Sequence, residues 1–487
     1  MAENGVILQC FEWYYPEGGK LWNDIAARAQ SFADKGITAM WLPPTGKGSH
    51  GGYDVGYAAY DLFDLGEFDQ HGTIPTKYGT RQQLLDAITA MHKAGLQVYA
   101  DVVFNHKDGA DAQEDVWAQE VDWNDRNKTV SDWYIIKADT KFTFPGRAGK
   151  YSTFNWFWWC FDALAKDYGN GDKRLYRLKN KSFTTEVSQE HGNYDYLLAD
   201  DLDMGEEYVQ KELKYWGEWF LNTTGVDGFR IDACKHIRSS WFPDWLGHLR
   251  GMFQRELFSV GEYWSGDTGE LQGYFSATSG VMSLFDVPLH YRFSAASNQG
   301  SGYDMRTIFD DTLTQQNPMR SVPFVENHDT QPCQSLQSPV EPWFKPHAYA
   351  LILLRQEGYP CVFWADYFGS SYKNCDPNKP DVILYSHQFL IDKFLYARKA
   401  YAYGDQHDYF DHPNTIGWVR TGNAQHPGAM AVLLTNGSDG TKWMNVYRPN
   451  ATFYDMTGHY GEKVTANQDG WANFKCPAGN VSVWLQE

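Results

Sequence analysis

An arginine and an aspartate two residues apart form the first candidate site. Arg230 and Asp232 belong to the stretch 228–236, which begins with β-forming residues and ends in a polar cluster. Because side chains alternate along a strand, Arg230 and Asp232 are expected to point to the same side. A guanidinium fixed beside a carboxylate keeps it ionised, as a carboxylate nucleophile requires. A purely structural ion pair at the end of a strand explains this stretch equally well.

Two further acids follow apolar runs that resemble buried strands. Glu262 ends the run that starts at Leu257, and Asp329 follows the run 321–325. Together with Asp232, they give three acids that each terminate a strand and precede a segment with helical character. In a parallel barrel the carboxyl ends of the strands meet on one face, where catalysis takes place. Three coincidences of this kind favour a catalytic site over packing.

The elements that must carry these acids alternate between strand and helix. Amphipathic helices are expected at 22–35 and 81–94, closed by Gly36 and Gly95. Such alternation is typical of βα units around a parallel sheet, and eight strands is the number found in TIM barrels. The expected strands are 6–10, 37–42, 96–103, the segments that lead to Arg230 and Glu262, 283–287, 321–325 and 360–364.

Two parts of the chain break this rhythm. Residues 105–207 have scattered aromatics, many Asp, Asn and Gly and little helical periodicity, which favours a small β-rich domain over a loop. From about Lys399 short strands alternate with turns, as in an antiparallel β-sandwich. The predicted fold is therefore α/β, a (β/α)8 TIM barrel with an inserted β-rich domain and a C-terminal β-sandwich. The expected domains are the barrel at 1–104 and 208–398, the insertion at 105–207 and the sandwich at 399–487.

Four stretches in order along the chain resemble the conserved regions of one enzyme family. They are 101–106, 228–236, the segment around Glu262, and 324–330, flanked by 8–14 and 55–62. These stretches resemble glycoside hydrolase family 13, the α-amylase family, and in particular its bacterial liquefying and cytoplasmic members. The resemblance implies a retaining endo-hydrolase of the α-1,4-glucosidic bonds of starch, glycogen and maltodextrins.

The resemblance also implies a role for each acid. Asp232 would attack the anomeric carbon, Glu262 would protonate the leaving oxygen and then act as base, and Asp329 would bind and distort the sugar. Arg230 would keep Asp232 charged by lowering its pKa. The positions that match the family's substrate-binding residues are Tyr57, His106, Arg230, Lys235, His236, Trp264 and His328. Taken alone, a loop tyrosine is often a rim residue, and a lone histidine is more often a satisfied polar group than a ligand.

Oxygen-bearing side chains in the insertion indicate a metal site. Carboxylate and amide oxygens that converge from loops suit a hard cation such as Ca²⁺, although such residues usually form Asx-turns. In the family a calcium ion bridges the insertion and the barrel, held by residues that match Asn105, Asp195, Asp201 and the backbone carbonyl of His236. Of four further aspartates that hold extra cations in the liquefying relatives, two are matched by Asp162 and Asp203. The other two are replaced by Thr184 and Gly205, so one structural calcium is expected.

Two other kinds of function remain open. An exo-type maltooligosaccharide-forming enzyme or a transglycosylase of the same family would carry the same motifs. Analysis of the products from starch, with glucose-acceptor controls, separates these activities. A catalytically inactive member that binds sugar or acts as a scaffold is a different class, and the retention of Arg230 and all three acids argues against it.

Composition limits which binding partners and which cellular compartment are expected for this protein. The net charge of -19 argues against nucleic acid, whose phosphates repel an acidic surface, and an α-1,4-glucan is the expected partner. No apolar run approaches ~18 residues, so no membrane span is expected. The start of the chain does not resemble a leader, and its 7 Cys are odd in number without a C-x-x-C pair. A monomeric protein of the cytoplasm with free thiols is therefore expected, unless a leader was removed.

Overall fold

A closed sheet of parallel strands forms the centre of the computed structural model, which describes residues 4–487 and leaves the first three residues of the expected barrel outside the described part. Its strands are β1 (Ile7–Gln9), β2 (Ala39–Leu42), β5 (Gln97–Val102), β12 (Gly228–Ile231), β13 (Phe258–Gly261), β14 (Ser283–Phe285), β15 (Ser321–Val322) and β16 (Cys361–Phe363). They follow the order β15-β14-β13-β12-β5-β2-β1-β16. A parallel bridge between Phe324 and Cys361 joins the two edges, so the sheet closes. The predicted TIM barrel is confirmed.

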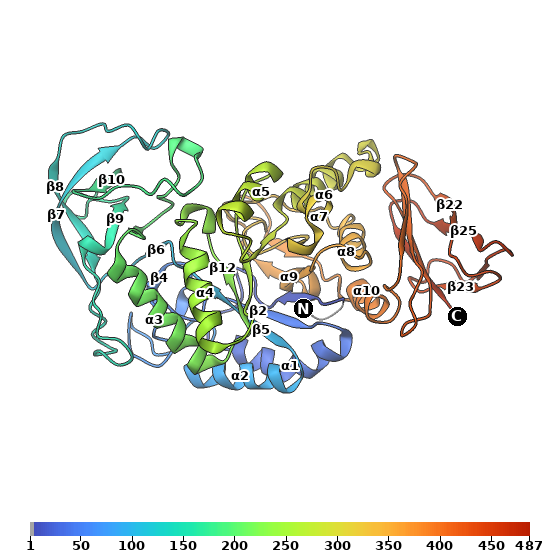
Figure 1. Ribbon diagram of the computed structural model, residues 1–487, viewed down its shortest axis with the longest axis horizontal. Helices are drawn as coiled ribbons and strands as arrows, with labels where there is room; N and C mark the ends of the chain where they lie inside the picture. The colour runs from blue at the N-terminus through green and yellow to red at the C-terminus, as the bar shows by residue number, and fades with distance from the viewer. Residues whose placement is uncertain (1–3) are drawn as a thin grey trace.

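Helices follow the barrel strands and cover their outer side (Figure 1). The longer ones are α1 (Leu21–Lys35), α2 (Arg81–Lys93), α3 (Glu207–Thr224), α4 (Trp241–Phe253), α5 (Thr268–Ala277), α6 (Val287–Gln299), α8 (Lys345–Leu353) and α10 (Gln388–Ala400). α1 ends where Gly36 adopts a φ of 109°, a left-handed conformation that favours glycine. α2 begins with a capping box between Thr80 and Gln83. Among residues 4–487, no helix is long and apolar enough to cross a bilayer.

A second sheet is built from the chain between β5 and α3, at the left of Figure 1. Its six strands are β6 (His106–Lys107), β7 (Ala112–Val121), β8 (Tyr134–Lys141), β9 (Phe161–Leu164), β10 (Leu175–Leu178) and β11 (Asp200–Leu202). They pair antiparallel in the order β6-β11-β9-β10-β7-β8. β6 starts four residues after β5 ends, so a short connection joins this sheet to the barrel. Its ladder places Asp201 on β11 opposite His106 on β6.

Two antiparallel sheets form the C-terminal part, at the right of Figure 1. Their strands are β19 (Gln406–Tyr409), β20 (Thr415–Arg420), β21 (Met430–Thr435), β22 (Gly440–Asn445), β23 (Thr452–Asp455), β24 (Val464–Thr465), β25 (Trp471–Cys476) and β26 (Val481–Gln486). The larger sheet has the order β19-β20-β21-β26-β23-β24, and β22 pairs with β25. Leu433, Phe474 and Trp484 belong to a buried cluster contributed by both sheets. The predicted β-sandwich is thereby confirmed.

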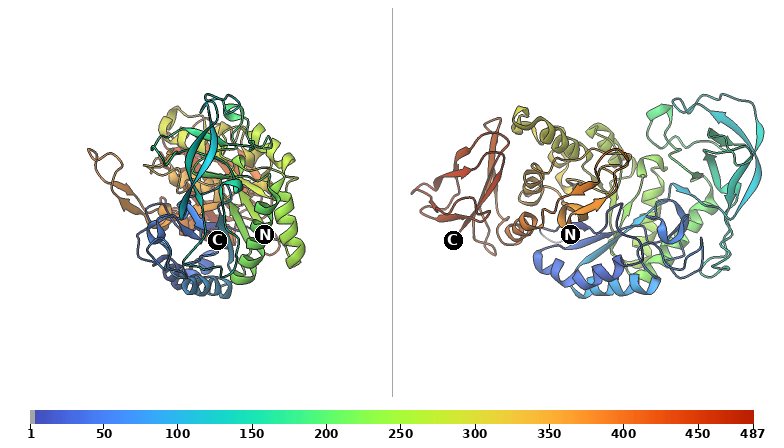
Figure 2. Two further views of the ribbon diagram at one scale, coloured as in Figure 1. Left: turned by 90° about the vertical axis from the view of Figure 1, so that its left-hand side faces the viewer. Right: turned by 180° about the vertical axis from the view of Figure 1, so that it is seen from behind.

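A short hairpin after β16 carries a disulfide that contradicts one expectation. β17 (Ser370–Tyr372) and β18 (Val382–Leu384) pair antiparallel, and the hairpin stands away from the barrel in Figure 2, left. Between these strands, Cys375 is bonded to Cys333, with 5.4 Å between their Cα atoms. The expectation of seven free thiols is wrong, because the fold brings together two loops that lie 42 residues apart in the chain. The free cysteines of the described part are all buried: Cys10, Cys160, Cys234, Cys361 and Cys476.

Candidate active site and metal centre

The guanidinium of Arg230 lies at the centre of the candidate active site. Arg230 is completely buried on β12, and its nitrogen Nη1 contacts Asp101 at 3.0 Å and Oδ1 of Asp232 at 2.5 Å. Its other terminal nitrogen, Nη2, donates to Oε2 of Glu262 at 2.8 Å. The register of the barrel explains this arrangement, because Arg230 is paired with Asp101 on β5 and with Val260 on β13. One planar guanidinium therefore holds three carboxylates from neighbouring strands.

Glu262 has the properties of a proton donor. Burial raises its pKa to about 7, Arg230 opposes that rise, and the charge of Asp232 adds to it. The backbone N–H of Ala233 donates to its Oε2 at 3.0 Å, from a left-handed turn with a φ of 47° that follows Asp232. A carboxyl group with such a pKa can keep its proton near neutral pH and give it to a leaving group.

Two opposing effects act on the pKa of Asp232. Arg230 lowers it, as the sequence predicts, but burial outweighs the guanidinium and the net pKa lies above the ordinary value. The effect of Arg230 therefore has the expected direction, but burial, which removes water from the carboxylate, decides the net pKa. Burial and then the charge of Glu262 raise the pKa of Asp329 well above its usual range.

A cleft of about 530 Å³ opens above these acids. Most of the residues expected from the sequence line it: Tyr57, His106, Asp232, Lys235, His236, Glu262, Trp264 and Asp329. Arg230 and His328 are completely buried and lie behind this surface. The ring of His328 stacks on that of Tyr57 with centroids 4.9 Å apart, so it supports the wall of the cleft. Lys235 is held in place by Oε1 of Glu190 at 2.7 Å and by the carbonyl of Trp264 at 2.9 Å.

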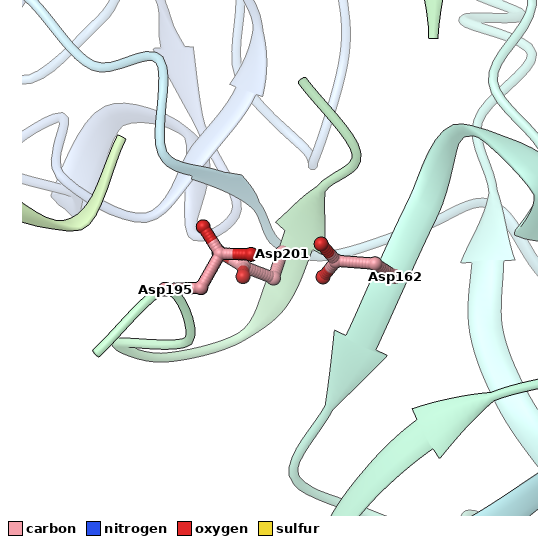
Figure 3. Close-up of side chains that lie close together, drawn as sticks. All are labelled: Asp162, Asp195 and Asp201. Carbon is pink, nitrogen blue, oxygen red and sulfur yellow. The ribbon is translucent and has the colours of Figure 1, made fainter. Parts of the chain in front are cut away.

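Three buried aspartates form a candidate metal centre beside the cleft. One oxygen each of Asp162, Asp195 and Asp201 lie within 4.8 Å of one another. Figure 3 shows the carboxylates of Asp195 and Asp201 close together, with Asp162 pointing toward them from its own strand. Burial raises the pKa of all three, that of Asp195 to about 7. Three carboxylates gathered away from water suit a bound cation.

Two neighbours of this cluster extend its oxygen ligands. The amide nitrogen of Asn105 donates to Oδ1 of Asp201 at 3.1 Å. Within residues 4–487, Oδ1 of Asn105 and Oδ1 of Asp162 are buried without a hydrogen-bond partner. His236 lies nearby, since its Nδ1 meets the carbonyl of Tyr194 at 2.8 Å, one residue before Asp195. Buried oxygen atoms that lack a hydrogen-bond partner are suitable ligands for a calcium ion, which binds oxygen.

Comparisons with known proteins agree with this geometry. A model of the α-amylase catalytic domain matches residues 21–379, and a model of the α-amylase C-terminal domain matches residues 430–485. The chain belongs to the α-amylase family. An α-amylase of Geobacillus stearothermophilus is 52% identical over 487 residues, which cover 99% of this chain and 87% of that relative. The cytoplasmic α-amylase of Escherichia coli K12 is 43% identical over 99% of both chains.

More distant structures share the fold of this family. A crystal structure of an α-amylase from Geobacillus thermoleovorans, complexed with acarbose, covers 100% of this chain and 98% of its own with a TM-score of 0.66. A crystal structure of an Anoxybacillus α-amylase covers 99% of this chain and 97% of its own with a TM-score of 0.65. Both are 16% identical to this chain, so they support its architecture alone.

Sequence reasoning missed several residues of this family member's site. Asp101 also accepts hydrogen bonds from Trp41 at 3.0 Å and from Tyr57 at 2.8 Å, and its position in the motif 101–106 was the available signal. Asp162 lies with Asp195 and Asp201 in one cluster of carboxylates. Trp13, in the flank 8–14, also lines the cleft, and the cleft residues without a distinctive local pattern are Glu190, Tyr194, Leu197, Leu198, Ser265, Gly266, Tyr291, Ser335 and Leu336.

Asp203 forms an ion pair with Lys181. Nζ of Lys181 lies 2.9 Å from Oδ2 of Asp203, and Oδ1 accepts the backbone N–H of Gly205 at 2.9 Å. A lysine ammonium therefore stands beside the carboxylate that matches a cation ligand of the liquefying relatives.

Proposed function

We propose that this chain hydrolyses internal α-1,4-glucosidic bonds of starch, glycogen and maltodextrins with retention of configuration, acting as a monomer. Asp232 is the nucleophile, Glu262 the acid and then the base, and Asp329 the group that binds and distorts the sugar. The observation that carries this assignment is the contact of Arg230 with Asp232 through one terminal nitrogen and with Glu262 through the other. Domain boundaries at 104/105, 207/208 and 398/399 complete the proposal.

The reaction follows from the positions of these groups. A glucan enters the cleft, stacks on Tyr57 and places its anomeric carbon beside Asp232. Asp232 attacks this carbon while Glu262 gives its proton to the departing glycosidic oxygen. A glycosyl ester on Asp232 results, and Glu262 then takes a proton from water as the water oxygen attacks the same carbon. Asp232 leaves as a carboxylate, and the two inversions give net retention.

Retention is supported by the closeness of the two carboxyl groups. The two terminal nitrogens of one guanidinium bind one oxygen of each carboxyl group, which favours a short separation between them. Retaining enzymes have a carboxyl separation of about 5–5.5 Å, and inverting enzymes about 6.5–9.5 Å. NMR of the first sugar released from maltooligosaccharide should therefore show the α-anomer. Early appearance of the β-anomer contradicts the assignment.

Product analysis separates the endo mode from its alternative. A relative from Bacillus sp. strain 707, named glucan 1,4-α-maltohexaosidase, is 47% identical over 490 residues, covering 99% of this chain and 93% of its own. An exo-type activity is therefore the second candidate. An endo-enzyme lowers the viscosity of amylose before short sugars accumulate. Release of one maltooligosaccharide at nearly unchanged viscosity would support the exo mode instead.

Activity is expected to fall as the pH rises through about 7. Burial raises the pKa of Glu262 to about 7 against the opposing charge of Arg230. The donor must carry its proton when the glucan binds, so its ionisation removes the acid and lowers kcat/KM. The measurement is the pH profile of kcat/KM on maltoheptaose. The residual activity of Glu262→Gln should lack this basic limb, and the same limb in that variant would assign it to another group.

We also propose one structural calcium ion, held by oxygens of Asn105, Asp195, Asp201 and the carbonyl of His236, with Asp162 as a further ligand. The ion would tie the insertion to the barrel and supply charge that neutralises the buried aspartates. Because it binds the native state alone, free calcium at about 100-fold its Kd adds about 2.7 kcal/mol to the free energy of unfolding. A chelator should therefore lower the melting temperature.

Two variants sharpen this test. Asp201→Asn should lower the melting temperature and abolish the effect of the chelator, since the cluster loses a charge. Asp203→Asn is the matched control on the same segment, because Asp203 is paired with Lys181 and its loss should leave chelator sensitivity intact. An unchanged melting curve with chelator, together with no calcium by elemental analysis, would contradict the proposal.

A cytoplasmic location is proposed from the name of the Escherichia coli relative, whereas the Cys333–Cys375 disulfide is typical of oxidising compartments. Thiol titration of the denatured, unreduced protein should therefore find five free cysteines, because the two bonded cysteines do not react.

The disulfide closes a loop of 42 residues, which adds about 4 kcal/mol to the free energy of unfolding, so reductant should also lower the melting temperature. Alkylation directly in cells decides the location: a persistent disulfide there contradicts the cytoplasm.

A further inference from the structure

Gln9, on β1, contacts His328 from behind the cleft. Its side chain is completely buried, and its amide nitrogen Nε2 lies 3.0 Å from Nδ1 of His328. An amide nitrogen carries protons and offers no acceptor, so it can only donate. Nδ1 of His328 must therefore accept this bond. A neutral ring with an accepting Nδ1 carries its own proton on Nε2.

The opposite side of the ring agrees with this assignment. Nε2 of His328 lies 3.2 Å from Oδ2 of Asp329, within ion-pair distance but, among the described residues, without hydrogen-bond geometry. When Asp329 is ionised, as stabilisation of a sugar cation requires, its oxygen can only accept. If the amide of Gln9 were turned over, its carbonyl would face Nδ1 and an unprotonated Nε2 would face this carboxylate. With Asp329 ionised, only the Nε2–H tautomer turns a proton of the ring toward this carboxylate while Nδ1 accepts from Gln9.

The surroundings of His328 allow no water to replace Gln9 as the hydrogen-bond donor to Nδ1. The ring is completely buried, stacks within 10° of parallel on Tyr57 and packs against Phe11 with centroids 5.1 Å apart. Water therefore does not compete for Nδ1. Burial, and then the charge of Arg230, lower the pKa of His328 well below its usual range, so the ring stays neutral. Within residues 4–487, Oε1 of Gln9 is buried without a hydrogen-bond partner. Burying this unpaired oxygen costs free energy of folding, so the amide is retained against that cost.

We propose that Gln9 is a positioning residue for the reaction: it fixes His328 as the Nε2–H tautomer, which in turn orients the carboxylate of Asp329 toward the sugar. The part played by Asp329 rests on the proposed function, whereas the tautomer of His328 does not. Loss of Gln9 disturbs a group that acts in the transition state, so it lowers kcat and leaves KM nearly unchanged.

The test combines spectroscopy with kinetics. NMR of protein labelled with ¹⁵N-histidine, with His328→Asn to assign the signals, should find His328 protonated on Nε2 in the native protein. Gln9→Glu replaces the donor by an acceptor, so a proton should move to Nδ1. Gln9→Met removes the hydrogen bond at similar volume. We expect both variants to lower kcat by about 10- to 100-fold, by analogy with residues that orient metal-binding side chains.

Tyr99→Phe serves as the control, because it removes a buried hydroxyl of the barrel interior that bonds to Tyr359 at 3.2 Å and touches no acid of the site. The proposal is overturned if native His328 carries its proton on Nδ1, if Gln9→Glu changes neither tautomer nor kcat, or if Tyr99→Phe lowers kcat as much. A shifted tautomer with normal kcat also overturns it. Normal turnover by Asp329→Asn would contradict the proposed function instead, while the tautomer measurement stands.

Discussion

Replacing Asp232 by asparagine should lower turnover of soluble starch by roughly 10⁴- to 10⁶-fold, the size of loss seen when a nucleophile is removed. The side chain keeps its shape, and its carbonyl oxygen can still accept from Arg230. An amide oxygen does not form the glycosyl ester, so the first chemical step fails rather than substrate binding. The measurement is kcat on maltoheptaose, together with a binding assay that should give a nearly normal Kd.

Glu262→Gln is the matched comparison. It also keeps its shape, but it loses the proton for the leaving oxygen and should nearly abolish hydrolysis of natural glucans. A substrate whose leaving group needs no proton should restore glycosyl-ester formation in Glu262→Gln and not in Asp232→Asn. This difference distinguishes nucleophile from acid. Near-normal turnover by Asp232→Asn, or equal rescue of both variants, would overturn the assignment.

Arg230→Met should be the most destabilising single change in the active site. It leaves Asp101, Asp232 and Glu262 buried without their cation, and breaking a buried charge network costs about 3–5 kcal/mol. Burial already raises the pKa of each of these groups, and Arg230 opposes the rise in each case. Without Arg230 their pKa values rise further, and activity should be lost with stability.

The sign of the pH dependence follows from proton binding. Carboxyls with a raised pKa bind more protons in the native state than in the unfolded state, so stability falls as the pH rises. The difference in unfolding free energy between the native protein and Arg230→Met should therefore widen from acid to neutral pH. Urea denaturation at a series of pH values measures it.

Arg147→Met is the control, since Arg147 is a buried arginine that pairs with Asp61 at 2.8 Å, away from the cleft. It should be less stable but keep its kcat. Equal loss of activity in both arginine variants would indicate that Arg230 acts through stability alone.

The parts of the site that the sequence could predict are those with a local signature. Asp232, Glu262 and Asp329 each follow a short apolar strand, and that pattern needs no knowledge of the fold. Asp101 lies within a strand, where an acid looks like any other inward-facing residue until Arg230 is known to be its neighbour. Burial of the assembled site, which sets the net pKa of Asp232, likewise has no signature in one strand.

Long-range pairings were harder to predict than strands. The disulfide between Cys333 and Cys375 depends on two loops whose approach follows from the position of the β17–β18 hairpin. Asp162 belongs to a strand of the insertion, and its approach to Asp195 depends on the order of that sheet. Local periodicity identifies elements, whereas these contacts depend on how the elements are arranged.

The insertion between two neighbouring barrel strands has a consequence for how the protein is made. Asp101 on β5 and Arg230 on β12 are adjacent in space but 129 residues apart in the chain. At about 5–20 residues per second, a ribosome needs roughly 6–25 s to deliver the second after the first. During this interval β5 has one unpaired edge, which is open to other chains. The barrel can therefore close only after the whole insertion has been synthesised, because β12 is the partner of that edge.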